Sequence, residues 1–262
     1  MDFDFIQRAM TVLTRGVGVT LMLTGLSVAI GFNIGLGLAL MRLSERRPVA
    51  LSAQYYSAIF RGTPLLVQIF LIYYGLGQFP AIRENAVLWW VFSDGARCAV
   101  LALALNTAAY TSEILRGGLM SVPAGLIEAA DAAGMSRSLR LRRIEFPLAI
   151  RQALPAYGNE LILVVKGTSL ASTITVLEIT GYAKRLMSQT FAVFEVFALA
   201  GAFYLIINLV LVLAVRLLER RLMRHVRRPD AGRSGWLRFP AAAPRRWWFR
   251  PLPGNVEERN PN

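Results

Sequence analysis

The feature that most constrains this chain is a stretch of 26 residues without a charge, from Gly16 to Met41. A helix needs about 20 apolar residues to cross about 30 Å of hydrocarbon, so this stretch is long enough to span a membrane. Its glycines at 31, 35 and 37 allow close packing between helices. Of all 262 residues, 55% are hydrophobic and 17% charged, whereas a soluble domain averages about 45–50% and about 25%. We therefore expect an all-α integral membrane protein.

Four further apolar stretches bring the expected number of transmembrane helices to about five. The third is short, and Arg97 and Glu113 at its ends could extend their charged groups toward water. The fourth is the least apolar, because it contains Glu160 and Lys166. A span is predicted in each of the ranges 16–41, 62–82, 97–115, 154–177 and 196–215. We assign residues 1–228 to this transmembrane domain and expect residues 229–262 to be a disordered cytoplasmic tail.

The segments that connect these spans differ in positive charge. Segments 42–61, 116–151 and 216–228 contain sixteen Arg, whereas the segments on the other side contain six Arg or Lys in all. Positively charged loops stay in the cytoplasm, which predicts an outside amino terminus and a cytoplasmic carboxyl terminus. The same distribution explains the net charge of +13 by topology and lipid headgroups, and it argues against nucleic-acid binding.

The sequence has few residues that could support catalysis or hold a metal. One cysteine, Cys98, and one histidine, His225, exclude an internal disulfide, a cysteine zinc cluster and a His-rich metal site. Neither Lys166 nor Lys184 stands in a Gly-Lys-Ser/Thr motif, so the chain has no phosphate-binding loop for ATP. We predict no catalytic residues, no metal and no cofactor in this chain, and expect any energy for transport to come from a partner.

Residues 121–147, predicted to be cytoplasmic, have the pattern of two short helices joined by a glycine. Pro123 suits a first helical turn, and Gly134 suits a left-handed residue at the end of that helix. Ser136 can cap a second, arginine-rich helix that should stop before Pro147. A basic amphipathic loop that only contacts lipid headgroups is the alternative.

Four segments carry motifs that occur in the same order in a known family. EAADAAG (128–134) followed by IEFP (144–147) has the pattern of an EAA loop, with Phe146 in place of the usual Leu. The other segments are FRGTPLLVQIFLIYYGL (60–76), YTSEILRGGLMSVPAGLIEAA (110–130) and LPAYGNELILVVKGTSLAS (154–172). Together they resemble the bacterial ABC-importer permeases for polar amino acids, in particular the histidine, arginine and opine type. Many members have Asp where this chain has Gly167.

The resemblance implies a permease subunit of an ATP-driven importer in the bacterial inner membrane, for polar, basic amino acids or opines. Its EAA loop would dock on a separate ATPase subunit that binds ATP-Mg. The partners implied are this ATPase, a second permease subunit of the same or a related sequence, a periplasmic substrate-binding protein and membrane lipids. The loop positions that match the motif are Glu128, Ala129, Ala130, Gly134, Ile144 and Pro147. An importer of another small solute, or a non-transporting membrane anchor or receptor, remains an alternative.

Ionisable groups inside a predicted span are candidates for the transport pathway. Glu160, beside Asn159, either lines a polar cavity that suits a cationic substrate or bonds to a neighbouring helix. Lys166 lies six residues further on, about 120° away around a regular helix, so we expect no direct pair between them. The sequence Arg-Gly-Thr-Pro at 61–64 is expected to mark a helix start at the inner surface.

Overall fold

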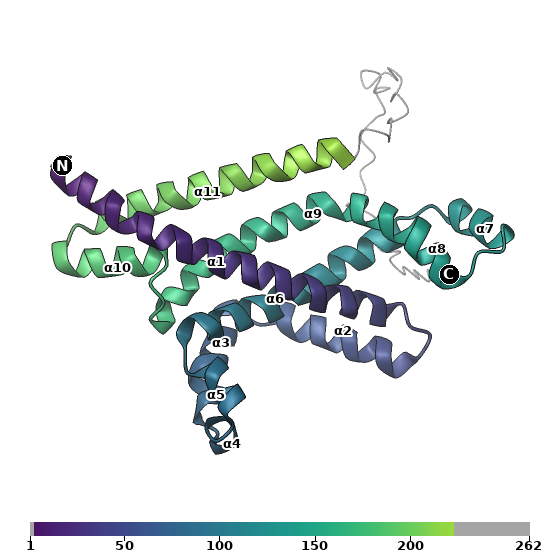
Figure 1. Cartoon of the computed structure of the whole chain (residues 1–262), viewed down its shortest axis with the longest axis horizontal. Helices are drawn as coiled ribbons and strands as arrows, with labels where there is room; N and C mark the ends of the chain where they lie inside the picture. Colours follow the sequence, from purple (N-terminus) through teal and green to yellow (C-terminus); the bar gives the residue numbers. More distant parts are fainter. Residues whose placement is uncertain (1–2, 223–262) are drawn as a thin grey trace, which may run out of the picture. The chain divides into compact units, whose positions relative to one another are not determined.

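The structure of the chain is a computed structural model that describes residues 3–222. Within this range nearly every residue is helical and no strand is present, which confirms the all-α fold (Figure 1). The predicted tail, 229–262, lies outside the described residues. The longer helices are α1 (Phe3–Arg42), α2 (Arg47–Gly62), α6 (Gly95–Met120), α9 (Phe146–Gly167), α10 (Ile179–Thr190) and α11 (Val193–Leu222).

Short helical segments connect these longer helices. The short α-helices are α3 (Leu65–Phe70), α4 (Pro80–Arg83), α5 (Ala86–Phe92), α7 (Ala124–Ala132) and α8 (Arg137–Arg140). Two π-helical turns are η1 (Leu71–Gly75) and η3 (Leu141–Glu145), and two 3₁₀ segments are η2 (Leu76–Gln78) and η4 (Thr168–Ile174).

Three described helices are long and apolar enough to cross a membrane, at residues 4–42, 95–120 and 193–222. Two bent pairs bring the number to five if each pair forms one span. One pair joins 47–62 to 65–78 with a bend of 103°, and the other joins 137–174 to 179–190 with a bend of 46°. The ranges predicted at 16–41, 97–115 and 196–215 therefore fall inside continuous helices, whereas 62–82 and 154–177 fall on bent ones.

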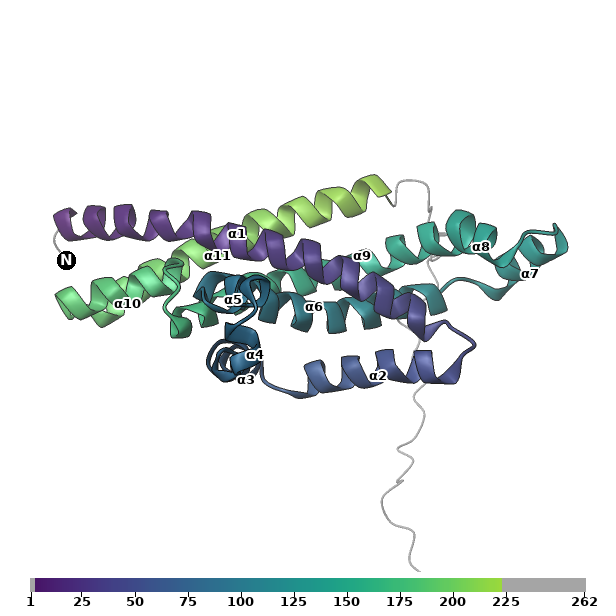
Figure 2. The same cartoon turned by 60° about the horizontal axis from the view of Figure 1, so that its bottom comes forward.

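Helices α1 and α6 run side by side in the same direction along the centre of the fold (Figures 1 and 2). A Cβ atom added at Gly35 would lie 2.7 Å from the Cβ of Thr111 and 2.9 Å from the carbonyl oxygen of Ala108. An added Cβ at Gly31 would likewise collide with Thr107. Small residues thus let the two backbones approach closely, which is how helices associate in lipid, where packing replaces the expulsion of water.

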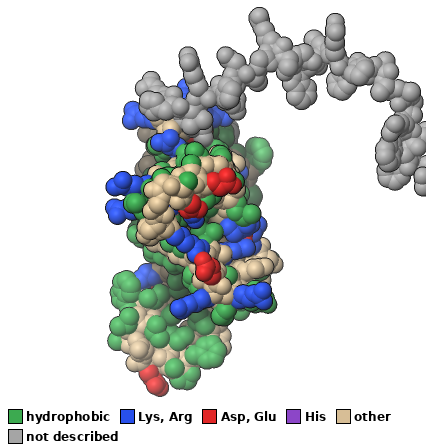
Figure 3. Space-filling model, turned by 90° about the vertical axis from the view of Figure 1, so that its right-hand side faces the viewer, with side chains coloured by type: hydrophobic (Ala, Val, Ile, Leu, Met, Phe, Trp, Pro, Cys, Tyr) green, Lys and Arg blue, Asp and Glu red, His purple; other side chains and the backbone are tan. Residues whose placement is uncertain are grey.

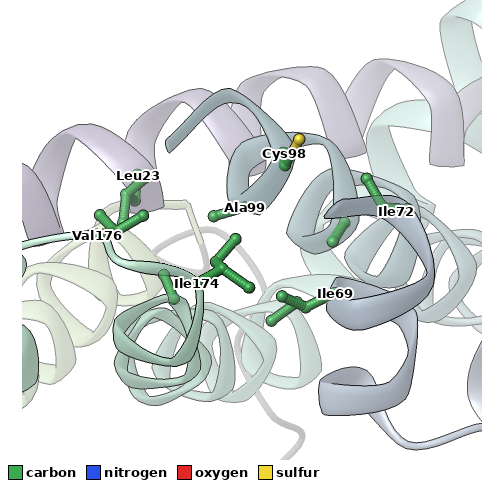
Figure 4. Packing of buried hydrophobic residues seen from close by; sticks show 9 residues of the cluster. Leu23, Ile69, Ile72, Cys98, Ala99, Ile174 and Val176 are labelled. Carbon is green, nitrogen blue, oxygen red and sulfur yellow. The ribbon is translucent and has the colours of Figure 1, made fainter. Parts of the chain in front are cut away.

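The main apolar cluster lies where α1, α3, α6 and the segment after α9 meet. Leu23 of α1 and Ile69 of α3 pack against Ala99 of α6 and Ile174 of η4 (Figure 4). The chain then turns at Thr175, which has a φ of +68°. Close to this turn, the buried carboxylate of Glu178 accepts hydrogen bonds from the backbone N–H groups of residues 180 and 181 and so caps α10.

The prediction of a helix that stops before Pro147 is wrong. The chain stays helical from Arg137 through η3 into α9, and Pro147 stands in the first turn of α9. A proline there loses little, because the π-helical turn before it already departs from regular α-helical hydrogen bonding. Ser136 is the residue before α8, as predicted, but its side chain makes no capping hydrogen bond.

Candidate coupling loop and translocation cavity

Helix α7 carries the EAA residues and ends in a left-handed glycine. Gly134 has a φ of +73°, as the sequence predicts. Its N–H donates to the carbonyl oxygen of Asp131 at 3.0 Å, and the N–H of Met135 donates to that of Ala130 at 3.1 Å. This pair of bonds is the Schellman motif, which satisfies carbonyls at a helix end and needs a residue with positive φ. The bend before α8 is therefore fixed by local backbone chemistry.

One face of α7 packs on the protein and the other is open. Ala130 is buried, whereas Glu128 and Ala129 are exposed and Leu126 is 45% exposed. The predicted position Ile144 is half-buried in η3, and Pro147 is exposed. A Cβ added at Gly134 would meet nothing within 4 Å in this chain. The glycine is therefore required for its positive φ and not for lack of space inside the chain.

A cavity of about 230 Å³ lies between α3, α6 and α9. Its polar lining consists of Asn106, Tyr110 and Glu160, and its apolar lining of Leu65, Leu103, Leu163 and Val164. Glu160 is buried, and its Oε1 atom accepts a hydrogen bond from the Oγ1 hydroxyl of Thr107 at 2.7 Å. Glu160 thus bonds to the neighbouring helix α6 and is also one of the residues that line this partly polar cavity; its part in a transport pathway stays a prediction.

The cavity adjoins a sharp elbow in the chain, where a helix start at the inner surface was expected. Helix α2 ends at Gly62, Thr63 is extended, and Pro64 precedes α3. Proline has no N–H and keeps the residue before it out of the helical region, so α2 ends within the Arg-Gly-Thr-Pro motif. Helix α3 starts directly after the motif, at Leu65, so the predicted helix start is confirmed, and the chain bends by 103° between the two helices. The freed carbonyl oxygen of Phe60 accepts hydrogen bonds from Gln68 Nε2 at 2.8 Å and from Asn106 Nδ2 at 3.2 Å.

An ion cluster next to the cavity was not found from the sequence. Glu113 of α6 forms ion pairs with Arg42 of α1, Arg61 of α2 and Arg116 of α6, and only 19% of its side chain is exposed, so it is held by arginines more than by water. The guanidinium carbon of Arg61 also lies 5.4 Å from the ring centroid of Tyr110, a cavity residue. Three arginines around one carboxylate leave a net positive charge beside the cavity.

The other two pathway candidates lie away from the cavity. Asn159 and Lys166 are exposed on α9, and neither is among the residues that line the cavity. Within residues 3–222, no ion pair joins Lys166 to Glu160, as their angular separation on a helix predicts. No group of His, Cys, Asp and Glu in this described range could hold a metal ion.

Comparison with known proteins assigns the chain to a family. The family described as "Binding-protein-dependent transport system inner membrane component" matches residues 15–224. The nopaline transport system permease protein NocM of Agrobacterium fabrum is 54% identical over 227 residues, which are 87% of this chain and 94% of the relative. The arginine ABC transporter permease protein ArtM of Haemophilus influenzae is 41% identical over 217 residues, or 83% and 95% of the two chains.

Solved structures agree with this assignment. A chain from the "Crystal structure of an amino acid ABC transporter with histidines" has a TM-score of 0.75 and 37% identity, over 84% of this chain and 99% of that one. A chain from inward-facing MetNI methionine ABC transporter shares the fold, with a TM-score of 0.63 and 23% identity over 87% and 100% of the two chains. The chain therefore belongs to the family of inner-membrane components of binding-protein-dependent transport systems.

Proposed function

We propose that the chain is the permease subunit of an ABC importer that moves basic amino acids or opines into the cell. Relatives above 40% identity are named for nopaline, octopine and arginine transport. The single observation that carries the substrate class is the buried carboxyl group of Glu160 at the wall of the cavity between α3, α6 and α9. Ionisable groups at membrane depth are expensive, and a guanidinium or ammonium group of the substrate would offset the charge.

The positive cluster beside the cavity supports the same class of substrate. Arginine, lysine and the opines carry a carboxylate as well as a cationic group. Arg61 lies against Tyr110 on one side of the cavity, while Glu160 stands on another. A zwitterionic substrate could thus be held by two groups of opposite charge, with Asn106 as a neutral hydrogen-bonding partner. Asn159 and Lys166, exposed on α9, would contribute only where a second permease subunit meets this helix.

In the proposed mechanism, substrate delivery, the transport pathway and ATP hydrolysis belong to different subunits. A periplasmic binding protein delivers the substrate, and a second permease copy or a related chain completes the pathway. The ATPase subunit binds the exposed face of α7 through Glu128 and Ala129, and its ATP-driven closure moves this loop and shifts the pathway from inward-facing to outward-facing. The proposed orientation has the amino terminus outside and α7 in the cytoplasm.

The substrate class is tested by changing the cavity carboxyl group alone. Glu160→Gln keeps the size and a hydrogen-bond acceptor for Thr107 but removes the charge. In proteoliposomes with the ATPase and the binding protein, we expect lower ATP-driven uptake of arginine and octopine, with normal subunit assembly. The matched control is Glu84→Gln, at an exposed carboxyl group outside the cavity. Wild-type uptake by Glu160→Gln over a range of substrate concentrations would contradict the proposal.

A further inference from the structure

One half-buried arginine connects the EAA helix to the helix that carries Glu160. Nη1 of Arg140 pairs with Oδ1 of Asp131 in α7. Nε of Arg140 donates to Oε1 of Glu145 at 2.7 Å, one residue before α9 begins. Only 18% of the Arg140 side chain and 15% of the Glu145 side chain are exposed. A single side chain therefore holds both sides of the glycine bend.

The chemistry of arginine suits this connection. Its planar guanidinium stays charged and presents five N–H donors in a fixed fork, so it can hold two carboxylates at once in a defined geometry. Backbone contacts hold the end of α7 only as far as Met135, and three residues from 134 to 136 separate α7 and its cap from α8. Without Arg140, only these backbone hydrogen bonds and the packing of Ala130 would hold α7 when it is pulled. With Arg140 in place, α7 and the start of α9 are tied together.

A second arginine of α8 extends the connection to another part of the fold. Nη1 of Arg137 pairs with Oε1 of Glu45, and its Nη2 donates to the carbonyl oxygen of Leu43 at 2.9 Å. Both partners lie in the loop between α1 and α2. Acidic and basic side chains accordingly gather on this end of the molecule (Figure 3). The side chains of the Arg137–Glu45 pair are 60% and 84% exposed, whereas those of the Arg140–Asp131 pair are 18% and 51% exposed, so we assign the firmer connection to Arg140.

We propose that Arg140 is a positioning residue, which transmits the movement of the docked α7 into α9 and so to the cavity. From Arg140 to Glu160 the chain is helical throughout, a length of about 30 Å at 1.5 Å per residue. A helix transmits such a displacement only if its end is held firmly to the part that moves. This inference rests on the proposed function, because it assumes that an ATPase moves α7.

The test compares Arg140 with its exposed neighbours in the complete transporter. Arg140→Gln, Arg140→Lys, Arg142→Gln and Arg143→Gln are purified with the ATPase and the binding protein and placed in proteoliposomes. The measured quantity is substrate transported per ATP hydrolysed. We expect Arg140→Gln to assemble and to lower this ratio by about five- to tenfold. Arg140→Lys should recover part of it, and Arg142→Gln and Arg143→Gln should match the wild type.

A distance measurement provides a readout that needs no substrate. Spin labels at Gly125 in α7 and Ala156 in α9, both exposed, report the separation of the two helices with and without ATP. A firm connection keeps the distribution of label-to-label distances narrow in the wild type, whereas Arg140→Gln should broaden this distribution. A wild-type ratio and a narrow distribution in Arg140→Gln would overturn the inference. An equal loss in Arg142→Gln would also overturn it, whereas failure of the wild type to transport basic amino acids or opines would contradict the proposed function.

Discussion

Replacement of Gly134 tests whether the EAA loop depends on a left-handed bend. The residue has a φ of +73°, and its N–H and that of Met135 donate the two hydrogen bonds that end α7. An L-residue in this conformation costs roughly 1–2 kcal/mol, whereas Asn adopts it more easily. Because an added Cβ meets no atom within 4 Å, this backbone term is the whole penalty within the chain. Gly134→Ala should therefore reduce the bent form by a factor of about 5–30, and Gly134→Val by more.

The assay is the affinity of the purified permease for its ATPase subunit, measured together with ATPase stimulation by loaded binding protein. The expected order of activity is wild type, Gly134→Asn, Gly134→Ala, Gly134→Val. All variants should insert normally, since the change lies outside the spans. If Gly134→Asn is weaker than Gly134→Ala, side-chain volume at the docking groove decides, and the argument from φ is refuted. Full activity of Gly134→Val would refute the EAA assignment itself.

Three further predictions follow from separate parts of the structure. Cysteines placed at the exposed Ser93 and Ser138 should label from opposite sides of the inner membrane, and labelling of both from one side in intact cells would contradict the proposed orientation. Glu128→Arg should leave membrane insertion intact but abolish co-purification of the ATPase, because it reverses a charge on the exposed face of α7; retained coupling would argue against docking there. Gln68→Leu should lower the free energy of unfolding in detergent by about 1–3 kcal/mol, because the carbonyl oxygen of Phe60 and the side-chain amide of Asn106 each lose a hydrogen-bond partner. Gln78→Leu should have little effect.

Properties set by neighbouring residues could be predicted from the sequence. The apolar stretches indicated helices, and α1, α6 and α11 contain the ranges expected for three spans. Gly134 was expected to be left-handed because helix ends have local rules, and its φ confirms this. The glycines of α1 were expected to pack closely, and Gly31 and Gly35 do so against α6. A Cβ at Gly37 would meet nothing within 4 Å, because this residue points away from α6.

Properties set by residues far apart in the chain could not be predicted. The elbow at Pro64 is held by Asn106, which bonds to Gln68 from 38 positions away. The surroundings of Glu113 come from three helices, so its pairing with Arg42 and Arg61 has no sequence signal. Hydropathy places Glu113 and the two arginines at the ends of spans, and only the packing of α1, α2 and α6 reveals that these side chains meet. A polar side chain beside a proline within an apolar stretch is the one signal that could have indicated the elbow.

The most direct test of the account is ATP-driven uptake of labelled arginine and octopine by the reconstituted permease, ATPase and binding protein. We predict accumulation that requires ATP, the binding protein and an intact Glu160, with competition by other basic amino acids and none by acidic ones. Efficient ATP-driven uptake that is confined to neutral or acidic solutes, and is unaffected by Glu160→Gln, would contradict it.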